Sequence, residues 1–249
     1  MGRFASTVEF YARYREPYPP EFFKQSARQI ALGGSETLLD VGCGPGLLAI
    51  GFAPFVGRCT GLDPEAAMIA AAKAAAAETG VELSLIHGRI EEFPTVQTYN
   101  VVTLGRALHL IERTAALSVL ERIVSDSGRI LICGASGVET PETAWVKSYK
   151  EECRAWTSRP DERRGSDGTE WFADSCFRGL GKTSVTVWHQ VTIADLVGRA
   201  LSKSSTSSQI LAKGQARFEA EIAAALEPFM QDGVLQEQIV ARGSIFGRR

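Results

Sequence analysis

Long apolar stretches are missing from this chain of 249 residues, and so is any marked imbalance of charge. No apolar run approaches the 18 residues that indicate a membrane-spanning helix, and no apolar segment near the first residues has the pattern of a signal peptide. The 27 lysines and arginines nearly balance the 29 aspartates and glutamates, which leaves a net charge of −2. We therefore expect a cytoplasmic protein whose partners include neither nucleic acid nor a membrane.

The sequence patterns of a metal site or a disulfide framework are also absent. The five cysteines are scattered and odd in number, and no C-x-x-C occurs. There is no H-x-x-x-H and no acidic cluster with the spacing of metal ligands. We expect free thiols, buried in the case of Cys43, Cys59 and Cys133, and no bound metal.

What the chain does contain is a glycine-rich loop between two apolar runs that each end in an acid. Residues 37–46 read TLLDVGCGPG, and the second run ends at Asp63. Glycines at every second position let the backbone turn sharply and approach a ligand closely. The dinucleotide fingerprint needs its third glycine where this chain has Leu47, so a nicotinamide cofactor is disfavoured. The pattern favours a nucleoside-binding strand–loop–helix. The alternative is a glycine-rich turn that binds nothing.

Strands and helices alternate along the first half of the chain. The strands expected there are 37–41, 59–63, 81–86, 99–104 and 129–133. The helices expected between them are 46–56, 65–78 and 112–124. This alternation predicts a parallel sheet with both faces covered. Two helices precede it, at 6–16 with a capping box at Ser6 and Glu9, and at 20–32 before Gly33-Gly34.

The pattern changes after residue 137. Helices are expected at 141–157, 193–201 and 213–231, strands at 183–193 and 238–246, and a charged loop at 158–170. No internal repeat and no long linker interrupts the chain, so we expect one domain over residues 1–249.

The glycine loop with Asp63-Pro64 resembles the cofactor loop of the class I S-adenosylmethionine (SAM) dependent methyltransferases. The chain is most similar to their small-molecule subgroup, which includes the trans-aconitate methyltransferases, over roughly residues 4–135. Three weaker likenesses are Tyr11-x-x-Tyr14-Arg15-x-x-Tyr18-Pro19, Ala107-Leu108-His109 and Gly128. The resemblance implies that a methyl group moves from SAM to an O, N or C atom of a small molecule, leaving S-adenosyl-L-homocysteine. The aromatic residues of the expected acceptor region suggest a planar or lipophilic molecule. A monomer or homodimer is expected.

The fold implied is α/β: a Rossmann-like, seven-stranded, mostly parallel sheet with helices on both faces. Within the single domain, residues 1–35 are expected to form an N-terminal helical lid and 36–135 the cofactor-binding core. Residues 136–249 are expected to form a cap after the fifth strand and the last strands.

The resemblance assigns cofactor contacts to the glycine loop, the strand ends and the lid. The residues concerned are Asp40, Gly42, Gly44, Gly46, Asp63, Pro64, Met68, Arg89, Ile90, Glu91, Gly105, Tyr11 and Arg15. Asp63 is placed to accept both ribose hydroxyls. Relatives usually carry an aspartate after the glycine at position 88, but this chain has Arg89, so the adenine contact is expected from the backbone at 89–90 or from Glu91. Asp40 could instead form a local backbone cap, and Met68 could be a core residue.

Two residues are candidates for the chemical step. Tyr11 is expected to close over the sulfonium, since an aromatic face attracts a cation. The alternative is ordinary packing of an N-terminal helix. His109 follows the fourth strand, at the edge where ligands bind in open α/β sheets, and is a candidate general base or hydrogen-bond partner of the acceptor. His87 is expected to be structural. His189 alternates with valines, which favours a core histidine over the alternative of a base.

The acceptor is expected to lie against the lid, residues 105–110 and the region 141–200. The candidate contacts are Tyr14, Tyr18, Arg106, His109, Trp145, Tyr149, Trp171 and Trp188. Buried aromatic residues serve a core equally well. Residues 104–107 read LGRA and lack the Asn/Asp-Pro-Pro-aromatic run of amino-directed DNA methyltransferases, which argues against a flipped base as acceptor. Two other functions stay open: SAM-dependent cyclisation or rearrangement of a natural product, and SAM binding without catalysis.

Overall fold

The computed structural model describes residues 8–94, 96–157, 167–203 and 205–249. The expected capping box at Ser6 and most of the expected loop 158–170 lie outside them. The chain divides into two compact units. The first unit comprises Met1–Pro17, Ala135–Glu162 and Thr186–Val240, and the second comprises Tyr18–Gly134, Arg163–Val185 and Ala241–Arg249. Whether the two units fold as one domain stays a prediction.

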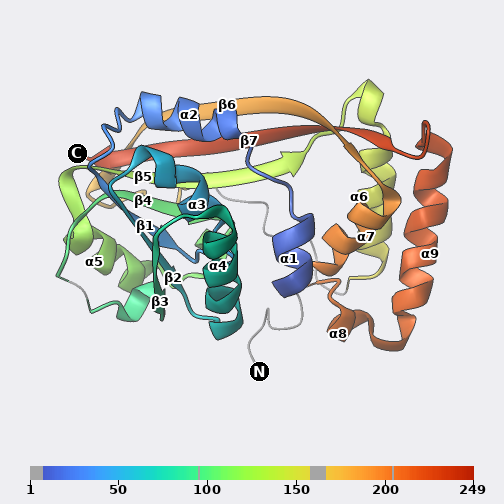
Figure 1. Ribbon diagram of the computed structural model, residues 1–249, viewed down its shortest axis with the longest axis horizontal. Coiled ribbons are helices and arrows are strands. Elements are labelled where there is room, and N and C mark those ends of the chain that lie inside the picture. The colour runs from blue at the N-terminus through green and yellow to red at the C-terminus, as the bar shows by residue number, and fades with distance from the viewer. Residues whose placement is uncertain (1–7, 95, 158–166, 204) are drawn as a thin grey trace. The chain divides into compact units, whose positions relative to one another are not determined.

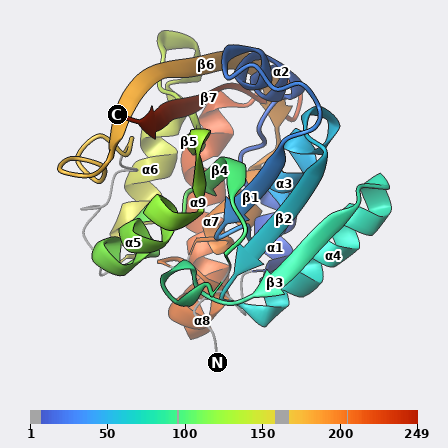
Figure 2. The same ribbon diagram turned by 90° about the vertical axis from the view of Figure 1, so that its left-hand side faces the viewer.

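A seven-stranded sheet in the order β3-β2-β1-β4-β5-β7-β6 forms the frame (Figures 1 and 2). Its strands are β1 Thr37–Val41, β2 Arg58–Asp63, β3 Leu83–His87, β4 Tyr99–Gly105, β5 Val124–Gly137, β6 Phe177–Val191 and β7 Leu235–Arg248. β1 to β5 pair in parallel. β7 runs against β5, because Val138 just beyond the end of β5 donates to Gln238 O, whereas Gly128 lies beside Gly247. The predicted α/β fold is confirmed.

The register of the parallel strands places several loops at one edge of the sheet. Val41 pairs with Leu62 of β2 and with Leu104 of β4, and Asp63 pairs with His87 of β3. The segments that leave β1, β2 and β4 therefore begin side by side at the carboxyl edge, which is where open α/β sheets bind ligands.

One helix of the second unit precedes these strands, the others lie between them in the chain, and together they cover the sheet. They are α2 Pro20–Gln29, α3 Leu47–Phe52, α4 Ala66–Thr79 and α5 Arg113–Ile123. Local chemistry sets their ends: the Glu112 carboxylate accepts from the backbone N–H groups of Thr114 and Ala115 at the start of α5, and Gly80 ends α4 with φ 69°. β1 and β4 are almost fully buried, as expected for a sheet covered on both faces.

The first unit contains α1 Val8–Tyr14, α6 Trp145–Ala155, α7 Ile193–Leu201, α8 Ser208–Leu211 and α9 Gln215–Leu226. α1 packs on α7, where a side chain at Gly198 would overlap the ring of Tyr14. A reciprocal capping box between Thr192 and Asp195 starts α7. Within the described part of the chain, no helix has both the length and the apolar character that crossing a membrane requires.

Candidate functional site

The glycine loop between β1 and α3 adopts a backbone conformation that side chains disfavour. Gly42, Gly44 and Gly46 have φ values of 66°, 53° and 86°, in the left-handed region. A Cβ at Gly42 would lie 2.6 Å from the Cβ of Ala107. The backbone N–H groups of Gly42 and Cys43 both donate to the Leu62 carbonyl, at 2.8 and 3.1 Å. The loop is therefore a fixed stretch of bare backbone at the carboxyl edge of the sheet.

Asp63 ends β2 directly beside this loop and is 6% exposed. One carboxylate oxygen accepts from Gly44 N at 2.8 Å, and the other accepts from Glu65 N at 2.9 Å. Burial raises the pKa of this carboxyl, and the two N–H donors oppose that rise. Each carboxylate oxygen can accept a second hydrogen bond, so Asp63 can receive two hydroxyl donors while it holds the loop.

Asp40 lies one residue from the end of β1, and its carboxyl faces inward. It is 1% exposed, accepts from the Thr103 hydroxyl at 2.8 Å and from Ala49 N at 3.3 Å. Burial raises its pKa from 3.8 to about 7, against the effect of these hydrogen bonds. Asp40 thus links β1 to β4 and to the first turn of α3. Its predicted contact with the cofactor stays a prediction.

Near β3, the site contains buried apolar residues and an ion pair between Arg89 and Glu91. Met68 and Ile90 are each 3% exposed. Glu91 accepts from Arg89 at 3.0 Å and from Glu112 N at 2.9 Å. Burial raises the pKa of Glu91, but these donors outweigh it and the pKa lies below its ordinary value. The Glu91 carboxylate already has two partners, whereas Met68 and Ile90 offer apolar surface.

The segment after β4 brings Gly105, Arg106 and His109 to the same edge. A Cβ at Gly105 would lie 2.7 Å from a methyl group of Leu48, so the glycine permits close packing there. Arg106 has φ 57°, which is unusual for a residue with a side chain, and its guanidinium lies 5.1 Å from the centre of the Tyr18 ring. His109 is exposed on the 3-10 turn Leu108–Leu110.

The other two histidines occupy different surroundings. Nε2 of His87 lies 2.9 Å from the Pro64 carbonyl, which supports the predicted structural role. His189 belongs to the first unit, and its Nε2 lies 2.7 Å from a carboxylate oxygen of Glu237. Its side chain is 33% exposed, so it is a partly exposed hydrogen-bond partner of Glu237 rather than a fully buried core residue.

Each aromatic residue near the N-terminus makes the contacts seen in the structure with residues of the same compact unit. The Arg15 guanidinium lies 4.7 Å from the centre of the Tyr11 ring and donates to Ser202 O at 3.3 Å. Tyr14 packs against Gly198 of α7. These three residues belong to the first unit, whereas the buried Tyr18 belongs to the second. The lid function of residues 1–20 stays a prediction.

Two of the four aromatic residues of the region 141–200 that were expected near the acceptor lie in the interior of the first unit. Trp145 and Tyr149 are 3% and 5% exposed, and they donate to the carbonyls of Gln236 and Leu196. Packing accounts for both side chains. Trp188 is 49% exposed, and Trp171 packs against the core of the second unit. Contact of these four residues with an acceptor stays a prediction.

Sequence reasoning missed Thr103, which holds Asp40 in place. Thr103 is fully buried in β4. The available signal was a hydroxyl side chain inside the apolar run Val101–Leu104, because a buried polar group needs a partner. The pattern could not say which of the acids in the chain that partner would be.

Comparison with known proteins identifies the central segment. Residues 38–128 match the family model of a methyltransferase domain. An uncharacterized methyltransferase of Bacillus subtilis is 26% identical over 155 residues, which cover 61% of this chain and 60% of that protein. A ubiquinone biosynthesis O-methyltransferase of Klebsiella pneumoniae is 31% identical over 112 residues, covering 44% of this chain and 45% of that protein. This chain thus matches less than two thirds of the length of these relatives.

Solved structures of low identity share the fold over nearly the whole chain. A protein from Anaeromyxobacter dehalogenans, proposed to be a type II methyltransferase, is 18% identical with a TM-score of 0.71, covering 94% of this chain and 98% of that one. A SAM-dependent methyltransferase from Thiobacillus denitrificans, solved in complex with S-adenosyl-L-homocysteine, is 15% identical with a TM-score of 0.56. It covers 100% of this chain and 99% of that one.

Proposed function

We propose that this chain, whose residues 38–128 match the model of a methyltransferase domain, is a class I SAM-dependent methyltransferase that transfers a methyl group from SAM to an O, N or C atom of a small molecule. One observation carries the proposal. Three left-handed glycines form a loop without side chains at the carboxyl edge, and a buried aspartate on the adjacent strand end holds that loop through Gly44 N. Bare backbone and a carboxylate with spare acceptor capacity fit a nucleoside that has no pyrophosphate.

The residues around the loop divide the proposed binding task. Asp63 accepts the ribose hydroxyls, and Gly42, Gly44 and Gly46 let the ligand approach the backbone. Met68 and Ile90 supply apolar surface for the adenine, together with the backbone at 89–90, because the Glu91 carboxylate is already held by Arg89 and Glu112 N. Asp40 acts indirectly, by fixing the first turn of α3 through Ala49 N.

The acceptor side is proposed at the segment that leaves β4. SAM carries a methyl group that its sulfonium already activates, so the protein mainly aligns the acceptor and excludes water. A base is needed only where the attacking atom still holds a proton at the moment of attack. His109 is the histidine of this segment, and it is the candidate that removes such a proton. Gly105 and Arg106 shape the surface beside it.

The test is label transfer from SAM to an unidentified acceptor. SAM carrying an isotopically labelled methyl group is incubated with the protein and a fractionated metabolite extract, and products are followed by mass spectrometry. We expect one class of small molecule to gain the labelled methyl, and Asp63→Ala to lose most of this activity. Asp126→Ala removes an acid whose side chain is fully exposed and serves as the matched control.

Other outcomes would contradict the proposal in distinguishable ways. A rearranged or cyclised product that requires SAM but gains no label would indicate the alternative chemistry on the same site. Binding of SAM without turnover of any acceptor would indicate a binding protein. Label transfer that is equal in the parent and in Asp63→Ala would place the cofactor elsewhere.

A further inference from the structure

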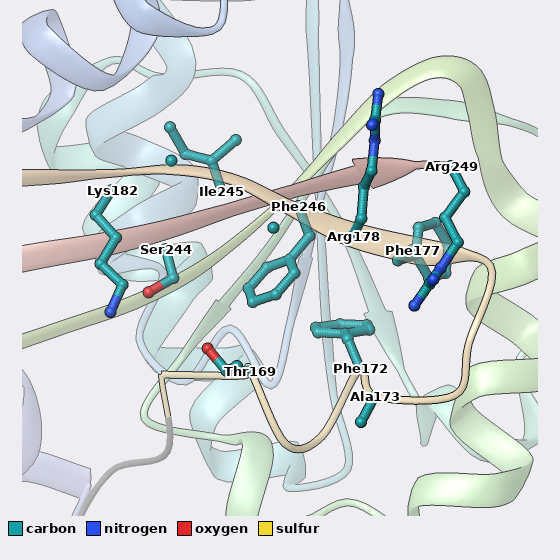
Figure 3. Close-up of a pocket in the computed structure, with 12 residues that line it drawn as sticks. Thr169, Phe172, Ala173, Phe177, Arg178, Lys182, Ser244, Ile245, Phe246 and Arg249 are labelled. Carbon is teal, nitrogen blue, oxygen red and sulfur yellow. The ribbon is translucent and has the colours of Figure 1, made fainter.

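A pocket of about 400 Å³ lies in the second unit, away from the glycine loop. It is bounded by residues 169–173, the beginning of β6 and the end of β7 (Figure 3). β6 is four places from β1 in the sheet, which is about 19 Å at the usual strand spacing. The volume falls within the range of roughly 300–1,000 Å³ that is typical of small-molecule sites.

The middle of the pocket is aromatic. The rings of Phe172 and Phe246 lie 4.7 Å apart between centres, and those of Phe172 and Phe177 lie 5.7 Å apart. All three side chains are at most 4% exposed, so the wall they form is firmly packed. Figure 3 shows the ring of Phe246 between the hydroxyl-bearing residues on one side and Phe172 on the other. Such a wall favours a hydrocarbon or aromatic group over a polar one.

One end of the pocket is polar and cationic. Lys182 and the hydroxyls of Ser244 and Thr169 lie toward this end in Figure 3. Ser244 is 8% exposed and lines the pocket. A hydroxyl can donate a hydrogen bond, so this position is suited to a ligand atom that accepts one.

The charge of the pocket is positive. Arg178, Lys182 and Arg249 are among its lining residues, which include no acid. Lys182 does pair with Asp167 outside the lining, at 2.7 Å. Both of these side chains are well exposed, at 69% and 46%, and an exposed pair of this kind is weak enough to be shared with a ligand anion. Arg178 points away from Phe172 in Figure 3 and contributes to the field rather than to a contact.

We propose that this pocket binds an amphipathic carboxylate. The carboxylate accepts from the Lys182 ammonium and from the Ser244 hydroxyl, and the apolar tail lies over Phe246 and Phe172. This ligand site is distinct from the candidate cofactor site, and it does not depend on the methyl-transfer proposal.

The probe for the test is decanoate, kept below its micellar concentration and followed by titration calorimetry. Two further probes separate the contributions of head and tail. Decyltrimethylammonium has the same tail with the opposite charge, and acetate has the head group without the tail. We expect saturable one-to-one binding of decanoate and no saturable binding of the other two. Equal affinity for the cationic probe, or no saturable binding of decanoate, would overturn the proposal.

Matched variants locate the site. Lys182→Met should weaken decanoate binding about tenfold, since a charge-assisted hydrogen bond is lost. Lys24→Met is the control, because Lys24 is a comparably exposed lysine that pairs with one acid, Glu21. Ser244→Ala, which only deletes a hydroxyl, should also weaken binding. Asp63→Ala should leave it unchanged. Binding that survives Lys182→Met and Ser244→Ala, or that fails in Asp63→Ala with the fold intact, would contradict the assignment.

Discussion

Asp40 and Asp63 belong to neighbouring strands, yet their carboxyls are held in different ways. Asp40 accepts hydrogen bonds from a side-chain hydroxyl and from a helix N–H, and it is buried in the interior. Asp63 accepts hydrogen bonds from two backbone N–H groups, one of them in the glycine loop. The first arrangement fixes strand and helix together. The second ties the loop to an acid that keeps the capacity to accept further hydrogen bonds.

The buried Asp40 should make stability depend on pH. Its pKa is raised by burial from 3.8 to about 7, so the protonated form is favoured in the folded state. The stabilising contribution is fully present below pH about 4 and is lost as the pH rises through 7. Asp40→Asn has no such titration. The unfolding free energy of the parent relative to this variant should fall by up to about 4 kcal/mol between pH 4 and pH 8, measured by urea denaturation.

The control for this measurement is Asp126→Asn, which changes an exposed aspartate of β5. The difference in unfolding free energy between this variant and the parent should stay nearly constant over the same pH range. If the difference in unfolding free energy between the parent and Asp40→Asn is also independent of pH, Asp40 is ionised in the folded protein throughout this range. Water or another group would then compensate its charge.

His109 is predicted to matter for turnover more than His87. If His109 removes a proton in the transition state, His109→Ala should lower turnover about 100- to 10,000-fold while SAM affinity stays nearly intact. His87→Ala is the matched control, because that ring contacts the Pro64 carbonyl beside the proposed cofactor position rather than the segment after β4. Turnover of His109→Ala within about threefold of the parent would remove it as a base.

At the scale of elements, the glycine loop should respond sharply to a single added methyl group. Gly42 and Gly34 both have left-handed backbones, with φ 66° and 89°. A Cβ at Gly34 meets nothing within 4 Å, whereas one at Gly42 overlaps Ala107. Gly34→Ala should therefore cost only the backbone strain, about 1–2 kcal/mol, in urea denaturation. Gly42→Ala should cost more and should also weaken SAM binding. If the two variants lose the same unfolding free energy, Ala107 can move aside without cost.

The link between α7 and β7 rests on a buried ion pair. Arg199 meets Glu237 through two contacts of 2.5 and 2.9 Å, and the side chains are 4% and 1% exposed. Arg199→Met or Glu237→Gln alone should cost about 3–5 kcal/mol, because each disrupts two charge-assisted hydrogen bonds of a buried group. The double variant should cost less than the sum of the two.

The control for this cycle is Arg217→Met. Arg217 pairs with Glu221 one turn away on α9, where both side chains reach solvent. Its removal should leave stability almost unchanged. A small effect of Arg199→Met, comparable to this control, would show that the buried pair does not hold α7 to β7.

Local patterns predicted some elements to the residue and others only in part. The apolar run 37–41 and the capped amphipathic segment 193–201 coincide with β1 and α7. β6 begins at Phe177, earlier than the expected 183, because Gly179 and Gly181 and the exposed side chains around them hide the alternation. β5 extends to Gly137 and β7 begins at Leu235, since pairing between distant strands prolongs both beyond their own propensity.

The site was predictable to the extent that it is local in sequence. The glycine loop could be read from its spacing, because a left-handed backbone favours glycine, and Asp63 could be read from its place at the end of an apolar run. The bond from Thr103 to Asp40 joins residues 63 apart, and that from Arg199 to Glu237 joins residues 38 apart. Such partners are chosen by strand order and packing, which no local pattern encodes.

At the scale of the whole molecule, each of the two compact units is built from discontinuous segments of the chain. The first unit takes its residues from three separate segments, and so does the second. The expected division into 1–35, 36–135 and 136–249 follows the chain in order, and it could not anticipate that β5, β6 and β7 each contribute to both units.

The central claim is that the glycine loop and Asp63 bind SAM, and calorimetric titration tests it most directly. The parent should bind S-adenosyl-L-homocysteine saturably and should not bind NAD. Asp63→Ala should lose about 1.5–3 kcal/mol of binding free energy for each ribose hydrogen bond removed, and Asp126→Ala should match the parent. Unchanged affinity for S-adenosyl-L-homocysteine in a folded Asp63→Ala, or equal affinity of the parent for NAD, would contradict the account.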